Sequence, residues 1–222
     1  MKVILPQIDY VFECEGDRCC SIVIENQNTF LNAVTDIFAQ VDGGEGKSVL
    51  SEDNKVISMA KHCEIISQYV PFDINQKSIL NKVAAKMQSI AMDEVHYIKT
   101  NELMGALESH LMELSLEMVG NFDFPKINID SMIKASGVRI NDLYAELGEK
   151  LLDYFELVRE YDTDKLFVLV GIRNYMSDDE MERFLESILT REINILMIEG
   201  NCRALLENEK RHIVDEDLCV IC

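Results

Sequence analysis

The spacing of apolar residues divides the chain into three parts, and the first of them mixes strands with one helix. In residues 1–72, apolar side chains recur at helical spacing over Thr29–Gln40, which predicts a helix. Short segments rich in branched and aromatic residues predict strands around it. These segments are Val3–Leu5, Tyr10–Glu13, Ser21–Glu25 and Cys63–Tyr69.

The second part, residues 73–125, has a helical pattern throughout. One apolar stripe runs from Ile79 to Ile90 and another from Leu103 to Met118, with no proline before Pro125. This pattern is typical of two long amphipathic helices, joined here near residues 93–100. The helix-breaking residues Gly120, Asn121 and Pro125 end the segment.

The third part, residues 126–222, alternates helices and strands. Helices are predicted over Ile129–Ala135 and Asp142–Glu160, while Leu166–Val170 and Ile193–Ile198 are continuous apolar runs typical of buried parallel strands. Between the two strands, Ser177 with Glu180 predicts a capping box that opens a helix to Thr190. The sequence therefore predicts an α/β head, residues 1–72 and 126–222, split by a helical insertion over residues 73–125.

Composition excludes several classes of protein. The chain has 40 acidic and 21 basic side chains, a net charge of −19, and 48% hydrophobic residues, which indicates a globular protein rather than a disordered one. No apolar stretch has the length of a membrane span. The first residues lack an export signal, so we expect a cytoplasmic protein whose seven cysteines are reduced and mostly buried.

A glycine-rich segment, Gly43–Ser48, resembles part of a nucleotide-binding loop. A complete phosphate-binding loop has a first glycine where this chain has Val41, and it lies between a strand and a helix. Here the segment follows a predicted helix instead. Glu199, at the end of an apolar run, is the candidate second acid of such a site. An NTPase using Gly43–Ser48 and Glu199 remains an alternative interpretation.

Positive charge collects in two windows of this acidic chain. Ile74–Met92 has no acidic residue, and Lys126–Arg139 has only Asp130. The two windows contribute the candidate DNA-binding residues Lys77, Lys82, Lys86, Lys126, Lys134 and Arg139. A local positive surface is required for binding nucleic acid even when the total charge is negative. The alternative interpretation is an ordinary solvated helix face.

Two acidic patterns suggest metal binding or, alternatively, a surface that faces water. Six carboxylates between Asp142 and Glu160 recur every three or four residues, so a helix would place them in one stripe. Such a stripe faces water, or it holds a hard cation such as Ca²⁺. His110, Glu113 and Glu117 also share one predicted helix face.

Several segments, in the same order along the chain, resemble the Csn-two family of type II-A CRISPR-associated adaptation proteins, and the length suits the short form of that family. The segments are Phe72–Asn75 with Ser78–Leu80, Ile133–Arg139, Asp164–Val170 with Met176–Glu180, and Ile193–Glu199 with His212–Asp217. The resemblance implies an α/β head similar to P-loop ATPases, without the nucleotide machinery, and helical legs.

The resemblance also implies a function. Family members are not enzymes, and four subunits form a homotetrameric ring that threads linear double-stranded DNA through a lysine-lined hole. They work with the spacer-integration proteins and the effector nuclease during spacer acquisition, and Ca²⁺ holds the ring in shape. Lys134 and Arg139 fall on basic positions of the family segment. Glu117, Asp123 and Asp130 are the candidate calcium ligands, although Gly120, Pro125 and Lys126 interrupt them. A helical protein-interaction module that does not touch nucleic acid is a further alternative.

Overall fold

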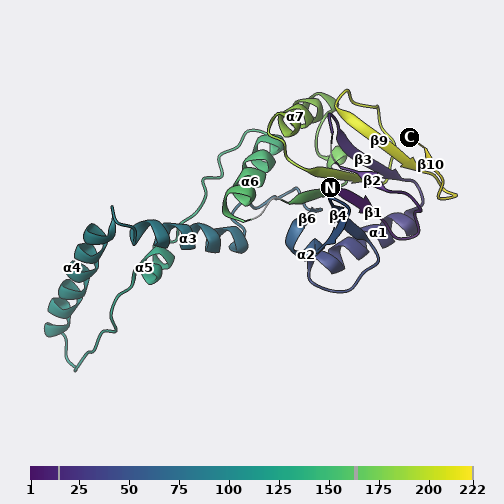
Figure 1. Ribbon diagram of the computed structural model, residues 1–222. Helices are drawn as coiled ribbons and strands as arrows, with labels where there is room; N and C mark the ends of the chain where they lie inside the picture. Colours follow the sequence, from purple (N-terminus) through teal and green to yellow (C-terminus); the bar gives the residue numbers. More distant parts are fainter. Residues whose placement is uncertain (15, 163–164, 222) are drawn as a thin grey trace. The chain divides into compact units, whose positions relative to one another are not determined.

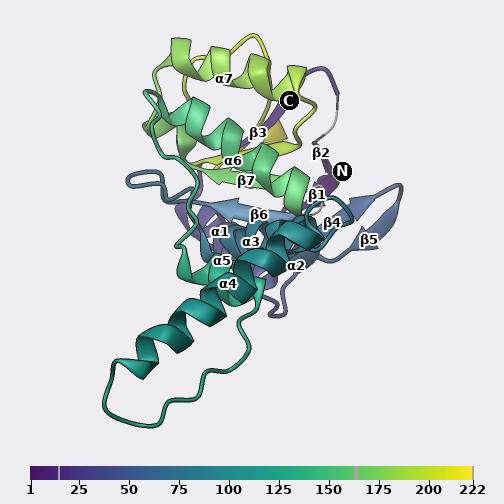
Figure 2. The same ribbon diagram turned by 90° about the vertical axis from the view of Figure 1, so that its left-hand side faces the viewer.

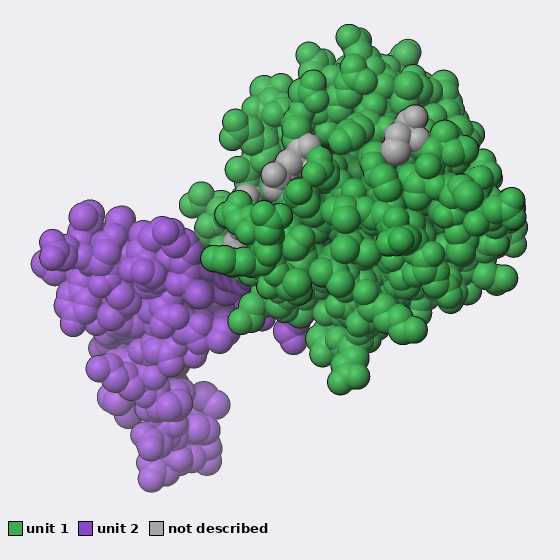
Figure 3. Space-filling model, turned by 45° about the vertical axis from the view of Figure 1, so that its right-hand side comes forward, with its two compact units in different colours: residues 1–74, 142–222 green, residues 75–141 purple. Residues whose placement is uncertain are grey.

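The computed structural model describes residues 1–14, 16–162 and 165–221, and the chain forms two compact units (Figure 3). The first unit, called the head, comprises Met1–Ile74 and Asp142–Cys222, and the second, called the helical unit, comprises Asn75–Asn141. Asp164 and Cys222 lie outside the described residues. Residues 126–141, predicted from the sequence as part of the head, belong to the helical unit because α5 packs on α3.

A six-stranded sheet forms the centre of the head, in the order β10-β9-β3-β8-β7-β6. All neighbouring strands are parallel except β10, which runs antiparallel to β9. The strands are β3 (Cys19–Ile24), β6 (Cys63–Ile66), β7 (Leu166–Val170), β8 (Ile195–Glu199), β9 (Glu209–Val214) and β10 (Val220–Ile221). The mixed α/β class predicted from the sequence is confirmed.

Helices cover both faces of this sheet (Figures 1 and 2). On one face lie α6 (Leu147–Tyr161) and α7 (Asp178–Thr190), where the rings of Phe155 and Phe167 stack with centroids 4.1 Å apart. The other face packs on α1 (Gln27–Val41) and the short α2 (Met59–His62). The side chains of a strand point alternately to the two faces of the sheet, and both faces are covered by helices. Every residue of β3 is therefore buried. This explains the absence of a polar alternation in the central strands.

A second, smaller sheet packs against the same core as α1. It is antiparallel, in the order β2-β1-β4-β5, with strands β1 (Lys2–Ile4), β2 (Phe12–Glu13), β4 (Val49–Glu52) and β5 (Lys55–Ile57). Phe12 and Leu50 bring its apolar face into the core. Cys14, Cys19, Cys20 and Cys63 are buried, as expected, but Cys202 and Cys219 are exposed.

The helical unit contains α3 (Lys77–Ala91), α4 (Tyr97–Leu116) and α5 (Ile129–Ala135). The turn between α3 and α4 falls where the sequence predicts it, because the Asp93 carboxylate accepts the backbone N–H groups of Val95 and His96. None of the helices in the described part of the chain is long and apolar enough to cross a membrane.

Local sequence signals set several element boundaries. The Ser177–Glu180 capping box forms and opens α7, and β7 and α5 have the predicted bounds. The predicted helix over Asp142–Glu160 is wrong at its start, since α6 begins at Leu147. The carboxylates before it are engaged elsewhere, because Asp142 pairs with Lys150 at 2.7 Å.

Candidate nucleic-acid interface

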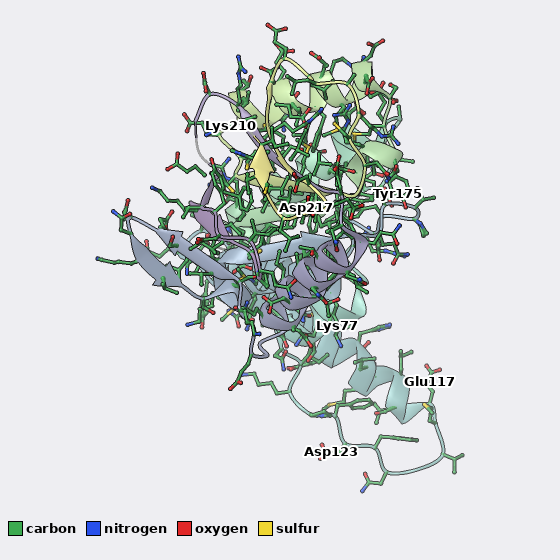
Figure 4. All side chains as sticks on the ribbon, turned by 90° about the vertical axis from the view of Figure 1, so that its right-hand side faces the viewer. Lys77, Glu117, Asp123, Tyr175, Lys210 and Asp217 are labelled. Carbon is green, nitrogen blue, oxygen red and sulfur yellow. The ribbon has the colours of Figure 1, made fainter. Side chains whose placement is uncertain are left out.

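The lysines of α3 do not share one face of the helix. Ile79 is the buried residue of α3, and Lys82 and Lys86 lie one turn apart on the same side. Lys77 precedes Lys86 by nine residues, which at about 100° per residue places it on the opposite side of the helix. The structure therefore brings Lys82 and Lys86 together and separates Lys77, labelled in Figure 4, from them.

Short helix α5 presents Lys134 next to α3. The Asn128 side chain caps α5 by accepting the Ser131 N–H at 2.8 Å, and Ile133 is buried. Lys134 is 62% exposed, and its Nζ lies 2.7 Å from Oδ2 of Asp130. An exposed pair of this kind contributes at most ~1 kcal/mol, so Lys134 can exchange this partner for a phosphate at little cost.

Two hydrogen-bonding side chains fix the remaining basic residues of the helical unit. The Asn75 carboxamide donates to the Ile140 carbonyl at 3.1 Å and accepts the Ile140 N–H at 2.7 Å, which holds the backbone beside the exposed Arg139. Glu108 accepts the Ile127 N–H at 2.8 Å and anchors the segment that carries Lys126. These supports join residues far apart in the chain, so no local sequence pattern indicates them.

Charge is distributed unevenly between the two units. The helical unit has seven of the 21 basic side chains and eight of the 40 acidic ones, so it accounts for −1 of the net charge of −19. The head accounts for the remaining −18. Lys99, exposed on α4, is a basic residue of this unit that the sequence analysis did not select, because Glu102 lies one turn away.

The candidate calcium ligands do not form a site. Asp130 is engaged by Lys134, and Figure 4 shows Glu117 and Asp123 at separate places around the segment after α4. Nowhere in the described residues do three or more His, Cys, Asp or Glu side chains gather so that they could hold a metal ion. Since Ca²⁺ requires six to eight oxygen ligands, no cluster among the described residues of one chain fits it.

Half of the six carboxylates in the stripe of the head form ion pairs. Glu146 lies 3.4 Å from Arg183 and Glu156 lies 2.7 Å from Arg191, in addition to the pair of Asp142 with Lys150. In the helical unit, His110 Nδ1 and Glu113 Oε2 are 3.9 Å apart, with both side chains more than half exposed. These acids therefore form a solvated surface.

The Gly43–Ser48 segment is held by a carboxylate. It connects α1 to β4, and the backbone N–H groups of Lys47 and Ser48 each donate to Asp36 at 2.7 Å. Burial acts to raise the pKa of Asp36, but the hydrogen bonds from Ser48, Lys47 and Gln40 outweigh it and lower the pKa. The Asp36 carboxylate already accepts hydrogen bonds from these two backbone amides. In addition, no helix begins at the segment. The Gly43–Ser48 segment therefore lacks the geometry that binds phosphate.

A buried polar cluster extends from the carboxyl end of β8 to the amino end of β9. Glu199 ends β8 and accepts the Arg173 N–H at 3.1 Å. The Arg173 guanidinium is 3% exposed and donates to Glu209 at 3.2 Å and to Asp178 at 2.7 Å. Burial raises the pKa of Glu199 to about 7, although the hydrogen bond from the Arg173 N–H and the charge of Arg173 act to lower it. At the carboxyl edge of the sheet, where α/β proteins commonly bind ligands, the Glu199 carboxylate is therefore engaged by the Arg173 backbone.

Comparisons with known proteins agree with this architecture. A family model described as CRISPR-associated protein (Cas_Csn2) matches residues 40–218. The CRISPR-associated protein Csn2 of Enterococcus faecalis is 19% identical over 204 residues, covering 91% of each chain. The Csn2 protein of Streptococcus agalactiae is 20% identical over 201 residues, covering 90% of this chain and 89% of that one.

A solved structure has the same fold. The crystal structure of Stu0660 of Streptococcus thermophilus superposes with a TM-score of 0.57 and 12% identity, over 95% of this chain and 74% of that one. Because the family model spans most of the sequence, the chain belongs to the Csn2 family of CRISPR-associated proteins. The resemblance found in the sequence is confirmed.

Proposed function

We propose that this protein is a non-enzymatic DNA-binding component of type II-A CRISPR adaptation. In this proposal, four copies form a ring whose helical units bind linear double-stranded DNA and assist spacer acquisition. The observation that carries it is the charge partition, since the helical unit has a balance of −1 within a chain of −19. Lys82, Lys86, Lys126, Lys134 and Arg139 supply the contacts to phosphate, and Lys77 contributes from the other side of α3.

Exposed apolar side chains support self-assembly of the helical unit. Ile98 and Leu116 on one side of α4 and Leu103 and Leu114 on another are 46–82% exposed. A helix that is apolar on more than one side is stable in water only when a partner covers it. A second copy of the same unit is the partner that this proposal assigns to α4.

Binding through these residues would depend on the DNA backbone and little on base sequence. Lysines that reach phosphates position a duplex without reading its bases. They also make the affinity fall with salt, with a slope near −0.9 for each phosphate contact. The partner proteins in this proposal are the spacer-integration proteins and the effector nuclease of the type II-A system.

Titration of the full chain with labelled linear duplex, at several salt concentrations, tests the proposal. We expect the double variants Lys82→Glu/Lys86→Glu and Lys134→Glu/Arg139→Glu each to weaken binding at least ~10-fold and to flatten the salt dependence. Closed-circular DNA should bind more weakly than linear duplex of the same sequence.

The matched control reverses two exposed lysines of the head, Lys47→Glu/Lys55→Glu, which changes the net charge equally. It should bind DNA within about twofold of the unchanged protein if contacts to phosphate are confined to the helical unit. Light scattering should give the same mass for all variants. Equal loss in the control, or an affinity that does not vary with salt, would contradict the proposed interface.

A further inference from the structure

One edge of the six-stranded sheet is incompletely paired. Strand β10 covers β9 only at Ile213 and Val214. Cys19 N–H donates to the Asn208 carbonyl at 2.8 Å and Glu25 N–H to the Val214 carbonyl at 3.0 Å, so the even-numbered residues of β9 face β3. The N–H and C=O of Arg211 therefore point outward, and neither ladder of β9 pairs them in the described part of the chain.

A cavity of about 470 Å³ lies over this open edge. Arg211 and Glu209 point to the face that holds Arg173, whereas His212 points to the opposite face, against Phe12 at 5.5 Å between ring centroids. Both sets of side chains line the same cavity, together with Leu205 and Ile221. A cavity that touches both faces of a strand must lie along its edge, where the free backbone groups are.

The surroundings of the cavity are basic and apolar. Arg18 and Lys210 are exposed, and the described residues place neither in an ion pair with a carboxylate. Glu13, whose carboxylate is close enough to feel the charge of Lys210, is itself paired with Lys2 at 3.0 Å. Leu205 is 63% exposed and Ile221 is 55% exposed. This is a positive region on a head that is otherwise strongly acidic.

We propose that this edge of β9 docks an extended segment of a partner protein in which acidic and apolar residues alternate. Such a segment would add a strand beside Arg211, with its carboxylates near Arg18 and Lys210 and its apolar side chains against Leu205 and Ile221. Sheet edges with unpaired backbone groups are templates for this kind of addition.

The same observations argue against two other occupants. A second copy of β9 that paired antiparallel about Arg211 would place the two Arg211 side chains directly opposite each other, and like charges across a strand pair are destabilising. A DNA duplex has no peptide groups to pair with Arg211 and would leave Leu205 and Ile221 in water. The peptide satisfies the backbone, the charges and the apolar side chains together.

Fluorescence anisotropy of the full chain with a labelled peptide of alternating valine and glutamate tests this inference. We expect Arg18→Glu/Lys210→Glu to weaken binding at least ~10-fold, and the control Lys47→Glu/Lys55→Glu to have no effect. The same peptide with N-methyl groups on alternate residues should not bind, because it cannot donate to the β9 backbone. Amide exchange of Arg211 should slow when the unmodified peptide is added.

Four results would overturn the inference: no binding of the peptide, equal binding of the N-methylated peptide, competition by linear duplex, or a protein mass that falls with Arg18→Glu/Lys210→Glu. The last would show that a second copy already covers the edge. The inference is independent of DNA binding, since Lys82→Glu/Lys86→Glu should bind the peptide normally.

Discussion

The head and the helical unit handle apolar surface in opposite ways. In the head, the central strands β3 and β8 are buried along their whole length and α6 and α7 cover one face of the sheet. Of the 24 exposed large hydrophobic side chains in the described residues, fourteen belong to the helical unit, although it has fewer than a third of the residues. The difference teaches that the head completes its own core, whereas the helical unit leaves apolar surface for the partner that the proposed function assigns to it.

The two units also differ in charge, and the two differences have a common interpretation. In the proposed function, the helical unit approaches both another copy and a polyanion, and it gains from being nearly neutral because self-repulsion and repulsion of DNA are then small. In the proposed assembly, the strong negative charge of the head would discourage DNA from binding outside the helical units.

Truncating the core of the head should give the largest effect on stability. Phe155 is 0% exposed and stacks on Phe167. We expect Phe155→Ala to lower the free energy of unfolding by about 3–5 kcal/mol, because it removes buried contacts and leaves a cavity. Chemical denaturation followed by circular dichroism, at one protein concentration, measures this change.

The matched truncation in the helical unit is Leu103→Ala, at a side chain that is 58% exposed. It should leave the denaturation midpoint of the head unchanged and instead weaken assembly, as measured by light scattering across protein concentrations. If Leu103→Ala destabilises the head as much as Phe155→Ala does, the interpretation that only the head has a complete buried core is wrong.

Ion pairs provide a second, smaller contrast. Arg173 is buried and pairs with the buried Glu209 and the exposed Asp178, so Arg173→Met should lower the free energy of unfolding by about 3–4 kcal/mol because the buried Glu209 loses one of its two arginine partners. The loss stays in this range because Arg211 still pairs with Glu209 at 2.5 Å. Thermal and chemical denaturation of the head measure it.

The counterpart in the helical unit is the exposed pair of Lys134 with Asp130. Lys134→Ala should change stability by no more than about 0.5 kcal/mol. A near-zero value would also make any loss of DNA binding by this variant a direct effect on the interface. A loss similar to that of Arg173→Met would instead assign Lys134 a structural role.

Much of the fold could be predicted from the sequence because its signals are local. The continuous apolar run of β7 and the capping box of α7 are properties of adjacent residues, and both are present. The start of α6 could not be predicted, because Lys150 and Arg183 engage Asp142 and Glu146 outside the helix. Long-range pairs of this kind leave no trace in periodicity.

The site was less predictable for the same reason. The acid-free window identified Lys82 and Lys86, but the separation of Lys77 became evident only from the helix geometry. The hydrogen bonds between Asn75 and Ile140 join the two ends of the helical unit. Those from the Gly43–Ser48 segment to Asp36 connect this segment to helix α1. Motif letters alone therefore suggested a phosphate site that the hydrogen bonds exclude.

The last predicted effect depends on pH and again distinguishes the buried head from the exposed helical unit. The pKa of Glu199 is raised from 4.5 to about 7 by burial, so folding favours its protonated form. The stabilisation from this group is complete below about pH 4.5 and is lost as the pH rises through about 7. Replacing it by Gln, which keeps an acceptor for the Arg173 N–H, should stabilise the head by about 2–3 kcal/mol at alkaline pH.

Near pH 4, Glu199→Gln and the unchanged protein should have similar stability, because Glu199 is then neutral in both the folded and the unfolded chain. Thermal melting across this pH range measures the divergence, with the exposed Glu25→Gln as the control that should follow the unchanged protein at every pH. A constant offset between Glu199→Gln and the unchanged protein at all pH values would mean that the carboxyl does not titrate in the folded head. The polar cluster would then be held by a permanently ionised Glu199 paired with Arg173.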